Sequence, residues 1–308
     1  MTSTSHLNVS PEVAHALAGG HGVVALESTL LAHGLPAGRN LEVGLRLERV
    51  VREAGAIPAT IAVLDGVARI GLDRAQLERV CDPGAGLAKL SRRDLGATIA
   101  LGRCGATTIS ATSALAHAAG IGVFGTGGLG GVHLPLPGEQ VSWDVSADLG
   151  TLAALPTLVV CSGVKSVLDI AATLEVLETH SVPVLGYRTE HFPGFYRRST
   201  GLPVSQRVDD PAEVAAAVRA HRRHAGSGLL LANPVPAEYE LDRALHDRLL
   251  AEGMAKLRAG GVRGSDVTPV LLEHFHRASA GASLDANEAL VLANARLAAE
   301  VAVELSPR

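Results

Sequence analysis

An acidic side chain and an amine each follow an apolar run that is typical of a buried β-strand. Glu27 comes directly after Val23–Leu26, and Lys165 follows the run that ends at Cys161. In open parallel sheets, ligands bind beyond the carboxyl ends of the strands, so both side chains are candidates for chemistry. Burial would raise the pKa of Glu27 and let it donate a proton at neutral pH, whereas the alternative is a simple loop cap. A lysine at a helix start is disfavoured as a cation, which favours a neutral amine that attacks a carbonyl; the alternative for Lys165 is an ordinary solvated lysine.

Further charged residues suit an anionic substrate and a metal ion. Lys89 precedes the pair Arg92–Arg93, a basic cluster that fits an anion or simply forms a solvated surface. Asp144 and Asp148 are four residues apart beside a helix predicted to begin at Ser146. The two carboxylates could bind one hard divalent cation, or they could only complement the helix dipole.

Two asparagines share one face of the last predicted helix, 283–305. Asn287 and Asn294 are seven residues apart, and a buried amide on such a face needs hydrogen-bond partners. Two histidine pairs lack any matching carboxylate pattern, so we interpret them as surface residues: His221 with His224, and His274 with His276.

A glycine motif at residues 125–130 matches the G-x-G-x-x-G pattern of dinucleotide-binding folds. That fold requires a helix to begin at the glycines, and Gly131, Pro135 and Pro137 would break it. We therefore expect a loop rich in backbone N–H groups that could hold an anion such as phosphate, with a plain tight turn as the alternative.

The composition excludes several classes of protein. With 308 residues, 47% hydrophobic and only 19% charged, the chain can bury a large core and is not disordered. A net charge of -4 and 3% aromatic residues argue against a nucleic-acid polymer as partner. The uncharged stretch 104–138 is interrupted by glycines and is no membrane span. Residues 1–10 lack the features of a secretory signal, and the three cysteines have no CxxC spacing, so we expect reduced thiols and a cytoplasmic protein.

Short apolar runs alternate with amphipathic segments, which predicts strands joined by crossover helices. We expect a single domain over 1–308 with a three-layer α/β/α fold and a mostly parallel central sheet; an α/β barrel is the alternative. The polar segment 187–210 could form a hairpin or a lid. Strands are predicted at 23–26, 58–64, 121–124, 157–161, 182–186 and 228–232, and helices at 41–54, 110–119, 146–155, 166–178, 211–224, 238–257, 268–280 and 283–305.

Several stretches, in their order along nearly the whole chain, resemble the pseudouridine-5'-phosphate glycosidase family, which includes the indigoidine-synthase-A-like proteins. They include Glu-Ser-Thr at 27–29, Asp-Val-Ser-Ala-Asp at 144–148 and Cys-Ser-Gly-Val-Lys at 161–165. The other matching stretches are 58–66, 89–95, 105–108, 126–133, 232–236 and 283–291. The link 134–138 is longer and more apolar than this family commonly has.

The resemblance implies reversible cleavage of the C–C glycosidic bond of pseudouridine 5'-phosphate to uracil and ribose 5-phosphate, an activity classed with the hydro-lyases. It implies that Glu27 donates a proton to the ribose ring oxygen and that Lys165 is the nucleophile, which forms an imine of the opened sugar. Asp144 would hold one Mn²⁺ ion, and the protein would be a homotrimer. Substrate would be bound by Lys89, Ile109, His133, Ser146, Ala147, Asp148 and Asn287.

Two other functions stay open. One is another lysine-dependent lyase acting on a sugar phosphate, or a relative from the indigoidine pathway. The other is a catalytically silent sugar-phosphate-binding protein. Because aromatic residues are scarce, we also predict that uracil is held by amides and backbone groups rather than by stacking.

Overall fold

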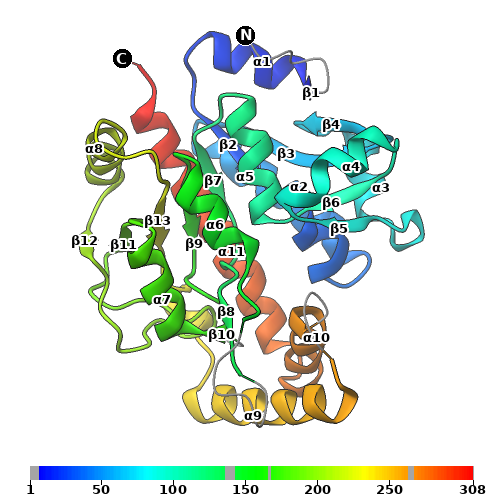
Figure 1. Cartoon of the computed structure of the whole chain (residues 1–308), viewed down its shortest axis with the longest axis vertical. Helices are drawn as coiled ribbons and strands as arrows, with labels where there is room; N and C mark the ends of the chain where they lie inside the picture. Colours follow the sequence, from blue (N-terminus) through cyan, green and yellow to red (C-terminus); the bar gives the residue numbers. More distant parts are fainter. Residues whose placement is uncertain (1–6, 136–142, 166–167, 263–266, 308) are drawn as a thin grey trace.

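A central sheet of 11 strands organises the molecule (Figure 1). The computed structural model describes residues 7–135, 143–165, 168–262 and 267–307; Ser166 and residues 136–138 of the 134–138 link lie outside it. The strands are β1 Leu7–Val9, β2 Val23–Leu26, β3 Ile57–Leu64, β4 Val67–Ile70, β5 Ala88–Leu90, β6 Gly105–Thr107, β7 Val123–Gly125, β8 Val132–His133, β9 Leu158–Cys161, β10 Leu168–Asp169, β11 Val184–Tyr187, β12 Gln206–Val208 and β13 Leu229–Ala232.

Helices connect most of these strands. They are α1 Pro11–Ala18, α2 Arg39–Glu53, α3 Arg74–Cys81, α4 Leu95–Ala100, α5 Ile109–Ala118, α6 Ala147–Ala154, α7 Ile170–Thr179, α8 Pro211–Arg222, α9 Arg243–Gly260, α10 Val267–Ala278 and α11 Ala282–Leu305. Four short helical turns, η1 Leu30–Gly34, η2 Pro83–Ala85, η3 Arg92–Asp94 and η4 Ala237–Tyr239, lie in the loops. No helix of the described residues is both long and apolar enough to cross a membrane.

The sheet is open and mostly parallel, as predicted. Its main path is β1-β4-β3-β2-β7-β9-β13-β11-β12, and every pair from β3 through β2 to β12 is parallel. Antiparallel pairing occurs where β3 meets β4 and β6. Among the described strands β1 and β12 end the path without pairing to each other, so the barrel alternative is wrong.

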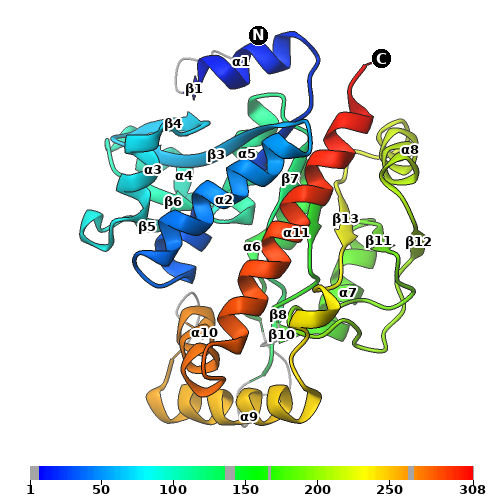
Figure 2. The same cartoon turned by 180° about the vertical axis from the view of Figure 1, so that it is seen from behind.

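Helices cover both faces of the sheet and create two main apolar cores. The first core contains Ala25 of β2 and Val159 of β9 together with residues of α5, α6 and α7. The second contains Leu26 and Val160, the next residues along the same strands, together with residues of α2, α8 and α11. Figure 1 shows α5, α6 and α7 in front of the sheet, and Figure 2 shows α2 and α11 on the opposite face. All four residues of β9 have 0% exposure, which explains why this strand is a continuous apolar run.

The structure differs from one predicted helix and adds detail to the predicted segment 187–210. The predicted helix 166–178 begins only at Ile170, because β10 pairs with β8 and Asp169 then caps the helix by accepting a hydrogen bond from Ala172. Within the segment 187–210 the chain folds back on itself as an antiparallel hairpin, with the pairs His191–Pro203 and Gly194–Arg197, whereas β12 at its end runs parallel to β11. Lys165 therefore lies in a loop, and a helix start cannot explain its chemistry.

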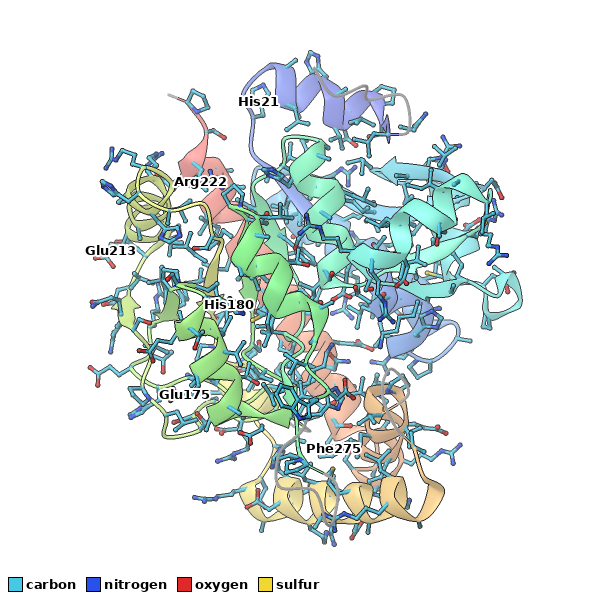
Figure 3. The ribbon with its side chains drawn as sticks, viewed as in Figure 1. His21, Glu175, His180, Glu213, Arg222 and Phe275 are labelled. Atoms are coloured by element: carbon cyan, nitrogen blue, oxygen red, sulfur yellow. The ribbon has the colours of Figure 1, made fainter. Side chains whose placement is uncertain are left out.

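One histidine prediction is also wrong. His274 is only 7% exposed and lies on α10, where its Nδ1 is 2.9 Å from Nζ of Lys256 on α9. The neighbouring Phe275 points into the molecule in Figure 3 and stacks on Tyr196 at 5.4 Å, whereas Glu175 points outward. The helix α10 therefore packs against both α9 and Tyr196. This packing buries His274, although its charged sequence neighbours indicated an exposed position.

The cysteines agree with the prediction of free thiols. Cys81 and Cys161 are buried, Cys104 is half-buried, and none of the three forms a disulfide. Burial raises the pKa of Cys161 to about 12, so this thiol stays protonated and inert although it lies close to Lys165.

Candidate active site

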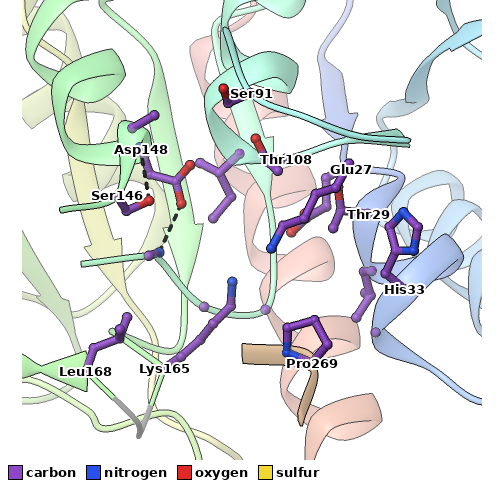
Figure 4. A pocket seen from close by; sticks show the side chains of 18 of the residues that line it. Glu27, Thr29, His33, Ser91, Thr108, Ser146, Asp148, Lys165, Leu168 and Pro269 are labelled. Carbon is purple, nitrogen blue, oxygen red and sulfur yellow. Dashed lines mark hydrogen bonds between the residues drawn. The ribbon is translucent and has the colours of Figure 1, made fainter. Parts of the chain in front are cut away.

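A cavity of about 320 Å³ lies at the carboxyl ends of the adjacent strands β2, β7 and β9 (Figure 4). This is where a parallel sheet places its ligands. Every site residue predicted from the sequence lines it. These residues are Glu27, Lys89, Ile109, His133, Asp144, Ser146, Ala147, Asp148, Lys165 and Asn287.

Glu27 begins the loop after β2 and is partly buried at the wall of the cavity. Thr126, which follows β7, donates a hydrogen bond from Oγ1 to Oε1 of Glu27. Burial raises the pKa of Glu27, and the opposing attractions of Lys165 and of the Thr126 hydrogen bond do not cancel this effect. The sequence prediction of a raised pKa is thus confirmed, and the carboxyl group is suited to donate a proton.

Lys165 is positioned by a ladder of backbone hydrogen bonds between two loops. The loop after β9 and the loop after β7 are joined by Ser162 N to Gly127 O at 2.8 Å, Leu129 N to Gly163 O at 2.9 Å and Lys165 N to Leu129 O at 3.2 Å. In Figure 4 the Lys165 side chain points toward the space between Asp148 and Glu27. Two loops from neighbouring strands therefore fix the amine and the acid at one cavity.

Asp148 joins two backbone segments that line the cavity. It is 6% exposed, and its two carboxylate oxygens accept hydrogen bonds from Ser110 N and Gly130 N, each at 3.0 Å. Ser146 caps α6 by accepting from Asp148 N at 3.2 Å. Asp148 therefore fixes two backbone segments, and the prediction that it shares one cation with Asp144 stays a prediction.

The glycine motif is a loop, as predicted, and not the start of a helix. After β7 ends at Gly125, the next element of the described chain is the short strand β8. The tight packing of this loop requires glycine. A Cβ at Gly128 would lie 2.6 Å from the Phe195 ring, and one at Gly130 would lie 2.3 Å from Ser146 Oγ. The N–H group of Gly130 does hold an anionic group, but that group is the carboxylate of Asp148.

Asp144 and His133 lie together at the cavity wall. Oδ2 of Asp144 is 3.8 Å from Nδ1 of His133, and the Asp144 side chain is 47% exposed. Burial lowers the pKa of His133, as do Lys89 and Lys165, while Asp144 opposes them. Among the described residues no cluster of three or more His, Cys, Asp or Glu could form a complete cage for a metal. The donor set fits a hard cation that takes few protein ligands and keeps most of its water.

Basic side chains gather at another part of the cavity. Lys89 on the exposed side of β5 and Arg93 of η3 both line it, together with His33 of η1. Burial lowers the pKa of His33 and the charge of Lys89 lowers it further, so His33 tends to be neutral. The fixed positive charge of Lys89 and Arg93 suits an anionic group of a ligand.

Two buried polar atoms in the cavity wall have no hydrogen-bond partner among the described residues. Asn287 is 1% exposed, and its Oδ1 accepts no hydrogen bond; the same holds for Oγ1 of Thr108, just before α5. Ile109, 2% exposed, begins that helix beside Thr108. Unpaired buried polar atoms are costly, which indicates that a ligand satisfies them.

The sequence reasoning missed other residues of the cavity wall. Phe195 is 3% exposed, has a φ of +62°, and brings an aromatic ring to the cavity from the segment predicted only as a lid or hairpin. Pro269 and Leu272 come from α10, and no pattern indicated that this helix faces the site. Thr29 and His33 could have been found, because they follow Glu27 in the loop after β2.

Comparisons with known proteins show which family this chain is similar to. A sequence model of the family described as indigoidine synthase A like protein matches residues 12–304. The pseudouridine-5'-phosphate glycosidase of Salinispora tropica is 53% identical over 308 residues and covers 99% of this chain and 94% of its own. The protein of that name from Streptomyces griseus is 54% identical over 297 residues, with 96% and 91% of the two chains covered.

Two solved structures share the fold. The prealnumycin C-glycosynthase AlnA, solved in complex with ribulose 5-phosphate, matches with a TM-score of 0.89 and 39% identity over 98% of this chain and 97% of its own. An indigoidine synthase A (IdgA)-like protein from Thermotoga maritima matches with a TM-score of 0.87 and 36% identity over 97% and 96%. The resemblance noted in the sequence is thereby confirmed: the chain belongs to the indigoidine synthase A-like protein family.

Proposed function

We propose that this protein is a pseudouridine-5'-phosphate glycosidase, which reversibly cleaves the bond between C1′ of the sugar and C5 of uracil. The observation that carries the proposal is the convergence of Glu27, with its raised pKa, and Lys165 on one cavity. The names of relatives about 50% identical over nearly the whole chain support the same reaction. A C–C glycoside has no heteroatom leaving group, so two carboxylates alone are a poor means of cleaving it.

The reaction begins with opening of the sugar. Glu27 gives its proton to the ring oxygen while the Lys165 amine bonds to C1′, so the C1′–O4′ bond breaks and the ring opens. After the new ammonium loses a proton, the nitrogen lone pair forms a C=N bond to C1′ as the C1′–C5 bond breaks, and C5 of uracil takes up a proton. Water then hydrolyses the iminium, which releases ribose 5-phosphate and restores the Lys165 amine.

The remaining cavity residues bind the substrate. Lys89 and Arg93 supply positive charge for the phosphate, and the backbone at Ile109, Ser146 and Ala147 surrounds it. Oδ1 of Asn287, which has no partner among the described residues, accepts an N–H of uracil. Asp148 acts mainly by holding the loop at Gly130 in place, and His133 completes the wall.

Asp144 holds one Mn²⁺ ion in this proposal, with water as most of its other ligands. When bound, the ion supplies positive charge beside the substrate. We further propose that the enzyme is a cytoplasmic homotrimer of single-domain subunits, classed among the hydro-lyases, with no nucleic-acid polymer or membrane as partner.

A second candidate is the formation of a C-glycoside with a different aromatic acceptor. It is favoured by the similarity to a C-glycosynthase solved with a pentulose phosphate. It would use the same sugar-phosphate half of the site and the same lysine, and would differ only in the wall near Asn287 and Phe195.

The test is release of uracil from pseudouridine 5'-phosphate by purified protein with Mn²⁺, followed by ultraviolet absorbance after chromatographic separation. Uridine 5'-phosphate is the control, because its N-glycosidic bond should survive. If pseudouridine 5'-phosphate remains intact while an added aromatic acceptor is converted to a C-glycoside with ribose 5-phosphate, the second candidate replaces the first.

A further inference from the structure

Behind the cavity, outside its lining, lies a fully buried amide. Asn294 of α11 has 0% exposure, and its Nδ2 donates to the carbonyl oxygen of Thr126 at 2.8 Å and to that of Gly127 at 3.3 Å. The same Nδ2 is 3.1 Å from Oγ of Ser162. Its Oδ1 accepts a hydrogen bond from Nδ2 of Asn233 at 3.0 Å. One side chain thus bonds to the loops that follow three neighbouring strands, β7, β9 and β13.

These loops carry the chemistry of the proposed function. Thr126 is the residue whose hydroxyl bonds to Glu27. Ser162 begins the loop that carries Lys165, and the two loops are joined by the backbone ladder described above. A shift of the Asn294 amide would therefore move two things together: Thr126, which bonds to Glu27, and the loop backbone that carries Lys165.

The helix that carries Asn294 cannot easily shift. At Gly125, the last residue of β7, an added Cβ would lie 3.2 Å from Cα of Ala295 and 3.2 Å from Cβ of Ala298. The residues Ala295 and Ala298 have 0% exposure. The helix α11 therefore lies directly against the strand, and Asn294 links this close contact to the loop that follows β7.

We infer that Asn294 is a positioning residue, which fixes the loops after β7 and β9 so that Lys165 meets the substrate in register with Glu27. This rests on the proposed function, in which Lys165 and Glu27 act on one sugar. Because catalytic groups must sit within a fraction of an ångström of the reacting atoms, loosening such a support reduces turnover more than binding.

The test uses Asn294→Asp, which keeps the shape and the oxygen facing Asn233 but removes the amide donors, and Asn294→Ser, which removes the reach of the side chain. The matched control is Ser227→Ala. Ser227 is 7% exposed just before β13, at the amino end of that strand and so opposite the cavity, and its hydroxyl donates to Ser181 O at 2.8 Å. Steady-state kinetics of uracil release and the rate of borohydride trapping on Lys165 are measured well below each protein's melting temperature.

For both Asn294 variants we expect kcat to fall ~10- to 100-fold and trapping to slow in parallel, while KM changes less than about 3-fold. Ser227→Ala should lower the melting temperature and leave kcat unchanged. If either folded Asn294 variant keeps wild-type kcat and trapping, or if the control loses as much activity, the inference is overturned. Absence of uracil release by the wild-type protein would instead overturn the proposed function on which it rests.

Discussion

Replacing Glu27 by Gln tests two consequences of its burial in a single variant. The amide keeps an oxygen that can accept the Thr126 hydrogen bond, but it cannot donate the proton that opens the sugar. Loss of a general acid lowers turnover by about 10²- to 10⁴-fold. We therefore expect kcat of Glu27→Gln to fall by a factor in this range, with KM little changed.

The same substitution should change how stability depends on pH. Because burial raises the folded-state pKa of Glu27, the folded protein binds more protons than the unfolded chain between the ordinary pKa and the raised one. The free energy of unfolding of the wild type therefore falls as pH rises through this window, by about 1.4 kcal/mol for each pH unit of separation. Glu27→Gln has no such titrating group. Its free energy of unfolding relative to that of the wild type should therefore rise with pH across the window and then stay constant.

The assay is guanidinium unfolding of both proteins at half-unit steps from pH 4 to pH 8, together with uracil release at pH 7. Parallel stability curves for the two proteins would refute the reasoning about burial. Retention of wild-type kcat by Glu27→Gln would refute the role as proton donor.

Three further predictions concern the cavity wall. Gly130→Ala places a Cβ 2.3 Å from Ser146 Oγ and should lower kcat about 10²-fold. The control is Gly150→Ala in α6, whose added Cβ meets nothing within 4 Å and which should keep full activity. Equal activity of the two variants would contradict the packing argument. Asp144→Asn should raise the Mn²⁺ concentration needed for half-maximal activity by at least ~10-fold in a metal titration, and an unchanged titration would show that Asp144 holds no metal. Asn287→Leu should raise KM for pseudouridine 5'-phosphate about 10-fold, because the uracil loses a hydrogen-bond partner. Product inhibition by ribose 5-phosphate should not change to a similar extent. A change in this product inhibition alone would show that Asn287 contacts the sugar rather than the uracil.

The sequence was sufficient for the central strands and for the residues at their ends. The runs that form β2 and β9 are bounded and wholly apolar, because helices cover both faces of the sheet, and this placed Glu27 and Lys165 correctly. The part of the sheet around β4, β5 and β6 was not predicted. The strands β4 and β6 pair with β3, β5 pairs only with β6 among the described strands, and β4 alternates between buried and partly exposed residues.

Other features depend on contacts that no local pattern contains. The start of α7 was misplaced because β10 exists only through its pairing with β8, two residues on each side. Phe195 has its positive φ because it is the first residue of a two-residue hairpin turn between Gly194 and Arg197, and no local pattern predicted that this turn reaches the cavity. The prediction that uracil is held without stacking stays a prediction, although one aromatic ring does line the cavity.

Covalent capture of the sugar on Lys165 tests the central claim most directly. Wild-type protein is incubated with Mn²⁺ and pseudouridine 5'-phosphate, reduced with borohydride, digested and examined by mass spectrometry. We predict a reduced pentose phosphate adduct on the peptide that contains Lys165, and neither adduct nor uracil release in Lys165→Ala. An adduct on Lys89 instead, or continued uracil release by Lys165→Ala, would contradict the account.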